Sequence, residues 1–247
     1  MEPFAAAVAV KWRDRPIAVR NPYKELIMTT LTTPPVAPLL TRLFADAEIT
    51  TAKLRALRAN ASPEEARRAQ GSDYRAFYLG QAKDLHLPVS AETGNLLYML
   101  IRSTGARHIV EFGTSFGIST IYMAAALKDN GGGKLIGTEF EPGKVAHARD
   151  NLRTAKLDEY VDIREGDALQ TLARELPASI DLVLLDGAKS LYAPVLELLE
   201  PHLRGGALVV ADNADMCPEY VARVRSPASG YVSLAIADDV ELSMKQR

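Results

Sequence analysis

The stretch from Ile109 to Thr120 constrains the fold of this chain more than any other. A short apolar strand, predicted over residues 108–112, runs into a turn that holds Gly113 and Gly117, and a helix is predicted from about residue 119 to 127. Glycine lets a backbone approach a ligand closely and adopts φ values that other residues resist. Strand, glycine turn and helix N-terminus are how an open α/β sheet forms a nucleotide pocket. The stretch therefore predicts an α/β domain with a ligand site at this turn.

The rest of the chain repeats the alternation of strand and helix. Further strands are predicted over residues 134–139, 160–164, 180–185 and 207–211, and helices over 142–155, 167–175, about 191–199 and 214–225. Residues 180–185 are almost wholly apolar, which is typical of a parallel strand buried on both faces. Residues 231–244 alternate as an antiparallel hairpin does, with Asp238 and Asp239 between its strands. The fold class is therefore α/β, a doubly wound, mostly parallel seven-stranded sheet closed by a C-terminal hairpin.

The chain before the sheet is predicted to form an extension and a helical appendage. Residues 1–34 have several prolines and no clear period, so we expect partial disorder, and a biological start at Met28 would leave residues 1–27 as an upstream extension. Residues 35–88 hold two predicted helices, 36–60 and 63–83. They form a cover or a homodimer contact, or a lid.

As a lid, the second of these helices would bring Tyr74, Phe77 or Tyr78 to a substrate. A third helix, capped by Ser90 and ended by Gly105, opens the predicted catalytic domain, residues 89–247.

Composition excludes several classes of function. The net charge is −2, so no basic field exists to hold nucleic acid, and no polybasic segment marks a membrane surface. Apolar runs are shorter than a membrane helix needs. The single cysteine, Cys217, suits a reducing compartment. We therefore expect a cytoplasmic protein with a small-molecule ligand.

Polar side chains follow each predicted strand, at the edge where ligands bind in such sheets. Glu139 ends the second strand and competes with Glu141 for a ribose, Glu139 being favoured because it ends the strand. Asp167 follows the third strand, where it can equally be only the N-cap of the next helix. Lys189, three residues after the fourth strand's Asp186, would alone be a surface lysine.

Asp186, Asp212 and Asn213 follow two successive strands, so we expect three oxygen ligands at one edge of the crevice. Two bare carboxylates there would repel each other and raise one pKa, and a divalent cation removes that cost. Oxygen ligands with open positions suit Mg²⁺. The four histidines have no ligand spacing, so zinc is disfavoured and the histidines are predicted to be structural or on the surface.

In order and spacing, five motifs resemble the cation-dependent class I O-methyltransferases, the group of catechol and caffeoyl-CoA O-methyltransferases. The resemblance covers about Ser90 to Arg247, and its motifs are 110–119 (VEFGTSFGIS), 137–142 (GTEFEP), 165–168 (EGDA), 185–192 (LDGAKSLY) and 210–213 (VADN).

The resemblance implies a Rossmann-like fold, S-adenosylmethionine as cofactor and a small phenolic, catechol-like substrate. Glu111 and Ser119 would lie near the amino acid end of the cofactor, Glu139 at the ribose, and Asp167 and Ala168 at the adenine. The loop itself, passing the methionine moiety, would comprise Gly113, Thr114, Ser115, Phe116 and Gly117.

The resemblance further makes Asp186, Asp212 and Asn213 the Mg²⁺ ligands and Lys189 the general base. Gly187-Ala188 and Ser190 depart from residues common in the family, which leaves the substrate open.

Three alternatives remain at this point. A nicotinamide-dependent oxidoreductase shares the sheet and the ribose acid, but the G-x-x-x-G turn here lacks the pattern of a diphosphate loop. An idle scaffold would have no reason to bring the polar groups together. A methyltransferase that needs no metal would use Asp186 and Lys189 as base elements, and activity after chelation would separate it from the metal-dependent enzyme.

Overall fold

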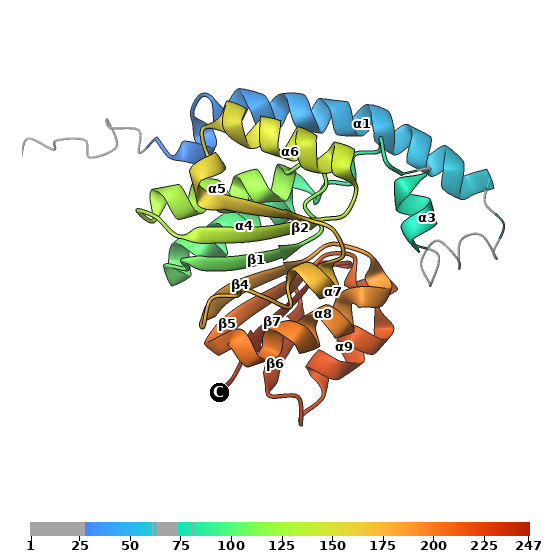
Figure 1. Cartoon of the computed structure of the whole chain (residues 1–247). Coiled ribbons are helices and arrows are strands. Elements are labelled where there is room, and N and C mark those ends of the chain that lie inside the picture. The colour runs from blue at the N-terminus through green and yellow to red at the C-terminus, as the bar shows by residue number, and fades with distance from the viewer. Residues whose placement is uncertain (1–27, 61, 63–73, 81) are drawn as a thin grey trace, which may run out of the picture.

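One sheet organises the part of the chain that the structure, a computed structural model, describes: residues 28–60, 62, 74–80 and 82–247 (Figure 1). Its strands are β1 (His108–Phe112), β2 (Lys134–Glu139), β3 (Val161–Glu165), β4 (Ile180–Leu185), β5 (Leu203–Ala211), β6 (Tyr231–Ala235) and β7 (Glu241–Lys245). Within these residues the strand order is β3-β2-β1-β4-β5-β7-β6. β1 to β5 pair in parallel, whereas β7 is antiparallel to both β5 and β6.

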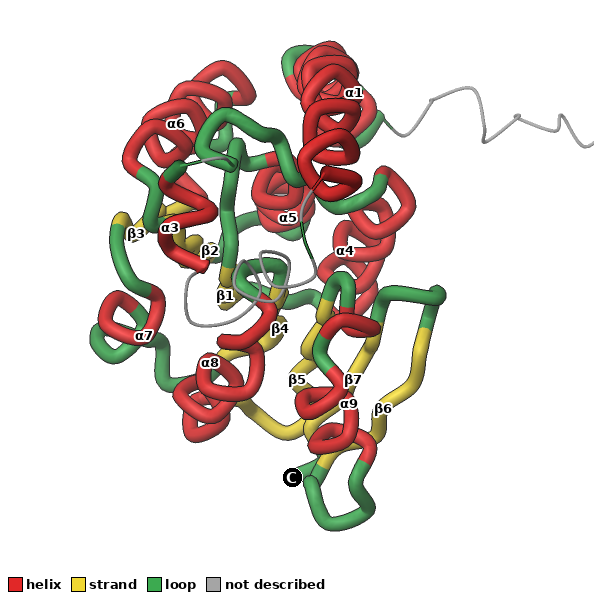
Figure 2. Tube along the Cα trace, turned by 90° about the vertical axis from the view of Figure 1, so that its right-hand side faces the viewer, coloured by secondary structure: helices red, strands yellow, loops and turns green. Residues whose placement is uncertain are grey.

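Helices cover both faces of the sheet (Figure 2). One face is covered by α4 (Ala91–Thr104), α5 (Ile118–Asp129) and α6 (Pro142–Ala155), and the other by α7 (Ala168–Thr171), α8 (Tyr192–Leu199) and α9 (Pro218–Arg225). α1 (Val36–Asn60) lies over α5 and α6, and α3 (Tyr74–Leu79) follows it. Short 3₁₀ turns are η2 (Thr30–Thr32), η3 (Asp158–Tyr160), η4 (Lys189–Leu191), η5 (Glu200–His202) and η6 (Ala214–Met216).

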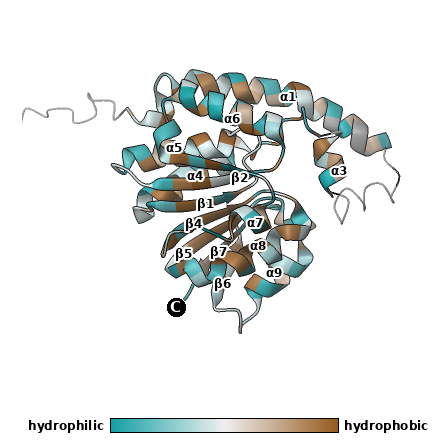
Figure 3. Ribbon diagram, in the orientation of Figure 1, coloured by the Kyte–Doolittle hydropathy of each residue, from teal (hydrophilic) through white to brown (hydrophobic). Residues whose placement is uncertain are grey.

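The centre of the sheet is the least polar part of the molecule (Figure 3). β4 is buried along its length apart from a partly exposed Asp181. Residues 118–127 of α5 are all buried, because α5 lies between the sheet and α1 and α4. A helix buried on all sides needs no polar face. In the described part of the chain, no helix has both the length and the apolar character needed to cross a bilayer.

The predicted fold class is confirmed, including the C-terminal hairpin. The third predicted helix has the expected ends: the Ser90 hydroxyl accepts from the Thr93 N–H (3.0 Å), and Gly105 follows it in the left-handed region. Residues 1–27 and most of the predicted helix 63–83 lie outside the described residues. Its described part, α3, ends at Leu79, so the prediction that it continues to residue 83 was wrong.

Three other predicted boundaries were wrong. The predicted helix over residues 167–175 is only α7, four residues long, because Arg164 donates to the carbonyl of its last residue, Thr171, and to those of Arg174 and Glu175 beyond it. β5 begins at Leu203 rather than 207, since Gly205 and Gly206 continue the strand. The predicted helix 214–225 is η6 followed by α9, whose first residue is Pro218.

Candidate cofactor and metal site

The ends of β1, β4 and β5 are joined by backbone hydrogen bonds one residue beyond each strand. The Asp186 N–H donates to the Phe112 carbonyl (2.8 Å), and the Asp212 N–H donates to the Leu185 carbonyl (3.0 Å). Parallel strands end at the same edge of a sheet. Gly113, Asp186 and Asp212 therefore follow three adjacent strands at one edge, as the sequence predicted.

Gly113 is needed where β1 passes β4. Its φ is 99°, and a Cβ added there would lie 2.4 Å from the Asp186 carbonyl oxygen and 2.7 Å from the Gly187 nitrogen. Both atoms are backbone and cannot rotate away. Gly113 was predicted only to let a ligand approach the backbone, and it has a second role in the close contact between the ends of β1 and β4.

Glu111 lies beneath the glycine loop and is fully buried. Its carboxylate accepts from the hydroxyls of Thr114 (2.8 Å), Ser119 (2.5 Å) and Thr120 (2.7 Å). Burial raises the pKa of Glu111 to about 7, although the three hydroxyls act to lower it. Glu111 and Ser119, both predicted near the cofactor's amino acid end, thus tie the loop to the start of α5 from below.

Replacing Glu111 by glutamine is expected to change how stability depends on pH. A folded-state pKa of about 7 against the usual 4.5 means that the folded protein binds more protons across this window. The free energy of unfolding of the wild type therefore falls as the pH rises from 4.5 to 7 and then levels off. E111Q lacks this loss, so its stability relative to the wild type should rise by about 3 kcal/mol between pH 5 and pH 8.

Urea unfolding at several pH values measures this, with E219Q, a change at an exposed acid of α9, as control. If the free energies of unfolding of the wild type and of E111Q changed with pH in parallel, Glu111 would not titrate in this window.

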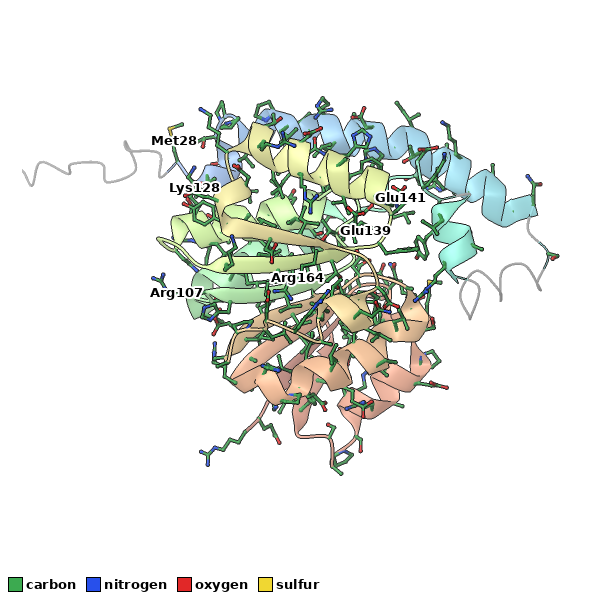
Figure 4. All side chains as sticks on the ribbon, viewed as in Figure 1. Met28, Arg107, Lys128, Glu139, Glu141 and Arg164 are labelled. Carbon is green, nitrogen blue, oxygen red and sulfur yellow. The ribbon has the colours of Figure 1, made fainter. Side chains whose placement is uncertain are left out.

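Glu139 is the last residue of β2 and Glu141 lies two residues beyond it; both are labelled in Figure 4, and their hydrogen-bond partners differ. Glu141 is the N-cap of α6, and its carboxylate accepts from the Lys144 N–H (2.6 Å). Glu139 accepts from the N–H groups of Ser115 (2.9 Å), Phe140 (2.9 Å) and Glu141 (3.0 Å), and is half-buried. Glu139 is therefore the acid in contact with the glycine loop, and its predicted role at a ribose stays a prediction.

Asp167 is the N-cap of α7, which is one of the two roles predicted for it. Its carboxylate accepts from the Leu169 N–H (3.0 Å). Its other oxygen accepts from Arg75 of α3, in a contact that links the appendage to this end of the sheet. Ala168, the next residue, is buried. The structure thus places α3 beside the predicted adenine end of the site.

Phe116 of the glycine loop is packed between imidazoles. The ring of His86 stacks on it at 3.8 Å between centroids, and that of His147 lies at 5.5 Å. Lys144 is also buried here, with its ammonium 5.7 Å from the Phe116 ring and 5.9 Å from the Tyr78 ring of α3. Burial lowers the pKa of Lys144. Sequence reasoning missed Lys144, because one lysine in the first turn of a helix carries no signal.

Asp186 is close enough to Asp212 to affect the ionisation of Asp212. Burial raises the pKa of Asp186 to about 6, and burial together with the Asp186 charge raises that of Asp212 to about 8. Asp212 is 6% exposed, and no donor among the described residues is hydrogen-bonded to its carboxylate. Asn213 follows in the left-handed region (φ 50°), where β5 turns into η6.

These residues fit a divalent cation by their chemistry. The carboxylates of Asp186 and Asp212, with the Asn213 amide beside them, are hard oxygen ligands, and of the two only Asp186 has a positive partner among the described residues, Lys189. Across the described ranges, no group of three or more His, Cys, Asp or Glu side chains is arranged to hold a metal. A cation here would therefore rest on the two carboxylates and the Asn213 amide.

Lys189 does not lie on the surface as an isolated lysine would. Its side chain is 12% exposed, and its ammonium donates to Asp186 Oδ1 (3.3 Å), to the Asp212 carbonyl (3.1 Å) and to the Tyr192 hydroxyl (2.6 Å). The structure thus brings Lys189 to the same strand ends as Asp186 and Asp212.

A cavity of about 850 Å³ adjoins Asp212 and Asn213. Its walls come from α1, from the start of α4 and from the loop between β6 and β7, and include Phe44, Pro88 and Ile236. This volume is within the range of small-molecule sites. This cavity could not be predicted from the sequence, because its walls come from segments far apart in the chain.

Comparisons with known proteins find similarity to methyltransferases. A family model described as a methyltransferase domain matches residues 110–214, which run from β1 through the glycine loop to Asn213. The catechol O-methyltransferase of Niastella koreensis is 37% identical over 130 residues, 51% of this chain and 58% of that protein. The catechol O-methyltransferase of Mycobacterium tuberculosis is 32% identical over 127 residues, 51% and 57% respectively. The matches span less than two thirds of these relatives.

Solved structures share the fold. Cofactor-bound Rv0187 from MTB has a TM-score of 0.62 at 23% identity, over 76% of this chain and 99% of that one. The O-methyltransferase TomG from Streptomyces achromogenes, involved in tomaymycin synthesis and solved in complex with SAM, has a TM-score of 0.57 at 26% identity, over 70% and 89%.

Proposed function

We propose that this chain, which carries the methyltransferase domain of the class I S-adenosylmethionine-dependent O-methyltransferases, methylates a hydroxyl of a small catechol-like phenol with the help of a divalent cation. The observation that carries the proposal is the meeting of Asp186, Asp212 and Lys189 beside the glycine loop. Asp186 and Lys189 belong to the segment that follows β4, whereas Asp212 follows β5, and the fold brings the two segments together.

The loop and the acids beside it would hold S-adenosylmethionine. Glu111 fixes the loop from below, so that its backbone is set before the cofactor binds. Glu139, at the end of β2, would meet the ribose, and Asp167 with Ala168 the adenine. Preorganisation of this kind lowers the entropy lost on binding.

Asp186, Asp212 and Asn213 would hold the cation. A divalent cation there would act as a Lewis acid that lowers the pKa of a bound hydroxyl. Lys189, in its neutral form, would accept the hydroxyl proton. S-adenosylmethionine would supply the methyl group: the bond between the phenol oxygen and the methyl carbon would form as the bond from that carbon to sulfur breaks, and the electron pair would stay on sulfur as a neutral thioether.

Burial of Asp186 and Lys189 keeps bulk water from the reacting groups, and the rigid strand ends supply the alignment that such a displacement needs. The direct contact between Lys189 and Asp186 also supports the second version of this function, in which the pair acts without a metal.

Calorimetry of S-adenosylmethionine binding, followed by a methylation screen over catechol-like compounds with Mg²⁺ or with a chelator, tests the proposal. We expect binding, and turnover that chelation abolishes. K189M should lower kcat roughly 100-fold, the scale of general-base catalysis, with cofactor Kd within about twofold. The control is K128M. Lys128 is an exposed lysine in the last turn of α5, on the opposite side of the molecule from Glu139 (Figure 4).

Cofactor binding without methylation of any phenol would contradict the function, and wild-type turnover in K189M would remove Lys189 as the base. Turnover that survives chelation would favour the version without metal. Homodimer formation through the N-terminal helices and a cytoplasmic location remain predictions.

A further inference from the structure

Tyr192, the first residue of α8, is completely buried and yet has its hydroxyl at the strand ends. The hydroxyl accepts from the Lys189 ammonium (2.6 Å) and donates to the Asp212 carbonyl (2.7 Å). A phenol has one proton and spare lone pairs. Since the proton is directed to the Asp212 carbonyl, the lone pairs are left for Lys189, and both contacts are satisfied at once.

We propose that Tyr192 is a positioning residue that holds the Lys189 amino group at the ends of β4 and β5. Its catalytic consequence rests on the proposed function, whereas the positioning itself does not. This role of Tyr192 could not be predicted from the sequence, because a tyrosine at the start of an apolar helix is most simply a core residue.

Lys189 needs such a contact, because a lysine side chain has several free rotations and loses about 2 kcal/mol of rotamer entropy when it is fixed. Of the three hydrogen bonds that the Lys189 ammonium donates, that to Tyr192 is the shortest, and the one to Asp186 Oδ1 is the longest, at 3.3 Å. A carboxylate that binds a cation is a weaker partner for an ammonium. The two uncharged partners, Tyr192 and the Asp212 carbonyl, are then the ones that hold Lys189.

The Tyr192 ring is itself fixed. It meets the Phe112 ring edge-on at 6.3 Å and the Tyr220 ring at 5.8 Å, and the Lys189 ammonium lies 4.9 Å from its centroid. Phe112 is the last residue of β1, so the ring is anchored on the sheet. A hydroxyl on a ring packed in this way is a fixed reference point for a flexible chain end.

Y192F tests the proposal, and Y220F is its matched control. Tyr220 is equally buried and packs on Tyr192, but its hydroxyl makes no hydrogen bond to Lys189 or to Asp212. The protein is treated briefly with acetic anhydride, and acetylation of Lys189 is measured by peptide mass spectrometry against the exposed Lys83. We expect Y192F to raise the labelling of Lys189 about tenfold, the scale of one lost hydrogen bond to a charged group, and Y220F to leave it unchanged.

Kinetics provide the second measurement. Y192F should lower kcat about tenfold with cofactor Kd unchanged, and should cost nothing further in a K189M background, because its effect passes through Lys189. Should Y192F not fold, 3-fluorotyrosine at position 192 keeps the shape but weakens the oxygen as an acceptor, and a smaller rise in labelling is expected.

Unchanged Lys189 labelling in the folded variant, an equal rise in Y220F, or a tenfold loss that persists in the K189M background would overturn the proposal. A wild-type protein that methylates nothing would contradict the proposed function instead, and the labelling would still decide whether Tyr192 holds Lys189.

Discussion

Replacing Asp212 by asparagine is expected to lower metal-dependent turnover about a thousandfold, which corresponds to about 4 kcal/mol of the barrier. Asp212 is 6% exposed, and its carboxylate has no hydrogen-bond donor among the described residues, so its charge is free for a cation. The amide keeps the shape and leaves the backbone carbonyl that binds Lys189 and Tyr192 in place. Cofactor affinity should therefore stay within about twofold, as calorimetry would show.

D215N is the matched control, because Asp215 carries the same charge three residues later but is exposed. A stability measurement gives a readout without turnover. Burial raises the pKa of Asp212 to about 8, so the wild type without added metal loses stability as the pH rises toward 8, and D212N should not. Full Mg²⁺-dependent turnover in D212N would show that the cation is held by residues other than Asp212.

Replacing Gly113 by alanine is expected to lower the free energy of unfolding by about 4 kcal/mol, from backbone strain and overpacking together. The new Cβ would lie 2.4 Å from the Asp186 carbonyl oxygen, and the φ of 99° is unfavourable for any residue with a side chain. Relief requires β1 and β4 to separate at their ends, which would also displace Asp186. Urea unfolding measures the loss.

G105A separates the two causes of the stability loss expected for G113A, backbone strain and overpacking. Gly105 also has a positive φ, 66°, but an added Cβ there would have no atom within 4 Å. The loss expected for G105A is about 1 kcal/mol, from conformation alone. Equal losses in the two variants would show that the close approach of the strand ends to Gly113 contributes nothing.

The positions of Asp186, Asp212 and Asn213 could be predicted from the sequence because they depend on strand ends. A run such as 180–185 can hardly be anything but a central strand, and the polar residue after it must then emerge at the carboxyl edge. Adjacent placement followed from the parallel order of the sheet. Nothing beyond local pattern and topology was required.

Other features depend on contacts between distant residues and left no local sign. The early end of α7 is set by the Arg164 guanidinium, which takes the carbonyls that a longer helix would use. The second role of Gly113 requires the backbone of Asp186. Tyr192 and Lys144 both look like ordinary helix residues until the surrounding elements are in place.

The walls of the cavity beside Asp212 and Asn213 come from other segments of the chain than the groups that would carry out the reaction. Asp186, Asp212 and Lys189 belong to the ends of central strands, whereas Phe44, Pro88 and Ile236 belong to α1, to the segment before α4 and to the hairpin loop. Those wall residues can change size or polarity without moving a strand. Under the proposed function, with the phenol bound in this cavity, the range of accepted compounds would therefore be open to redesign, or to drift, while the reaction itself is preserved.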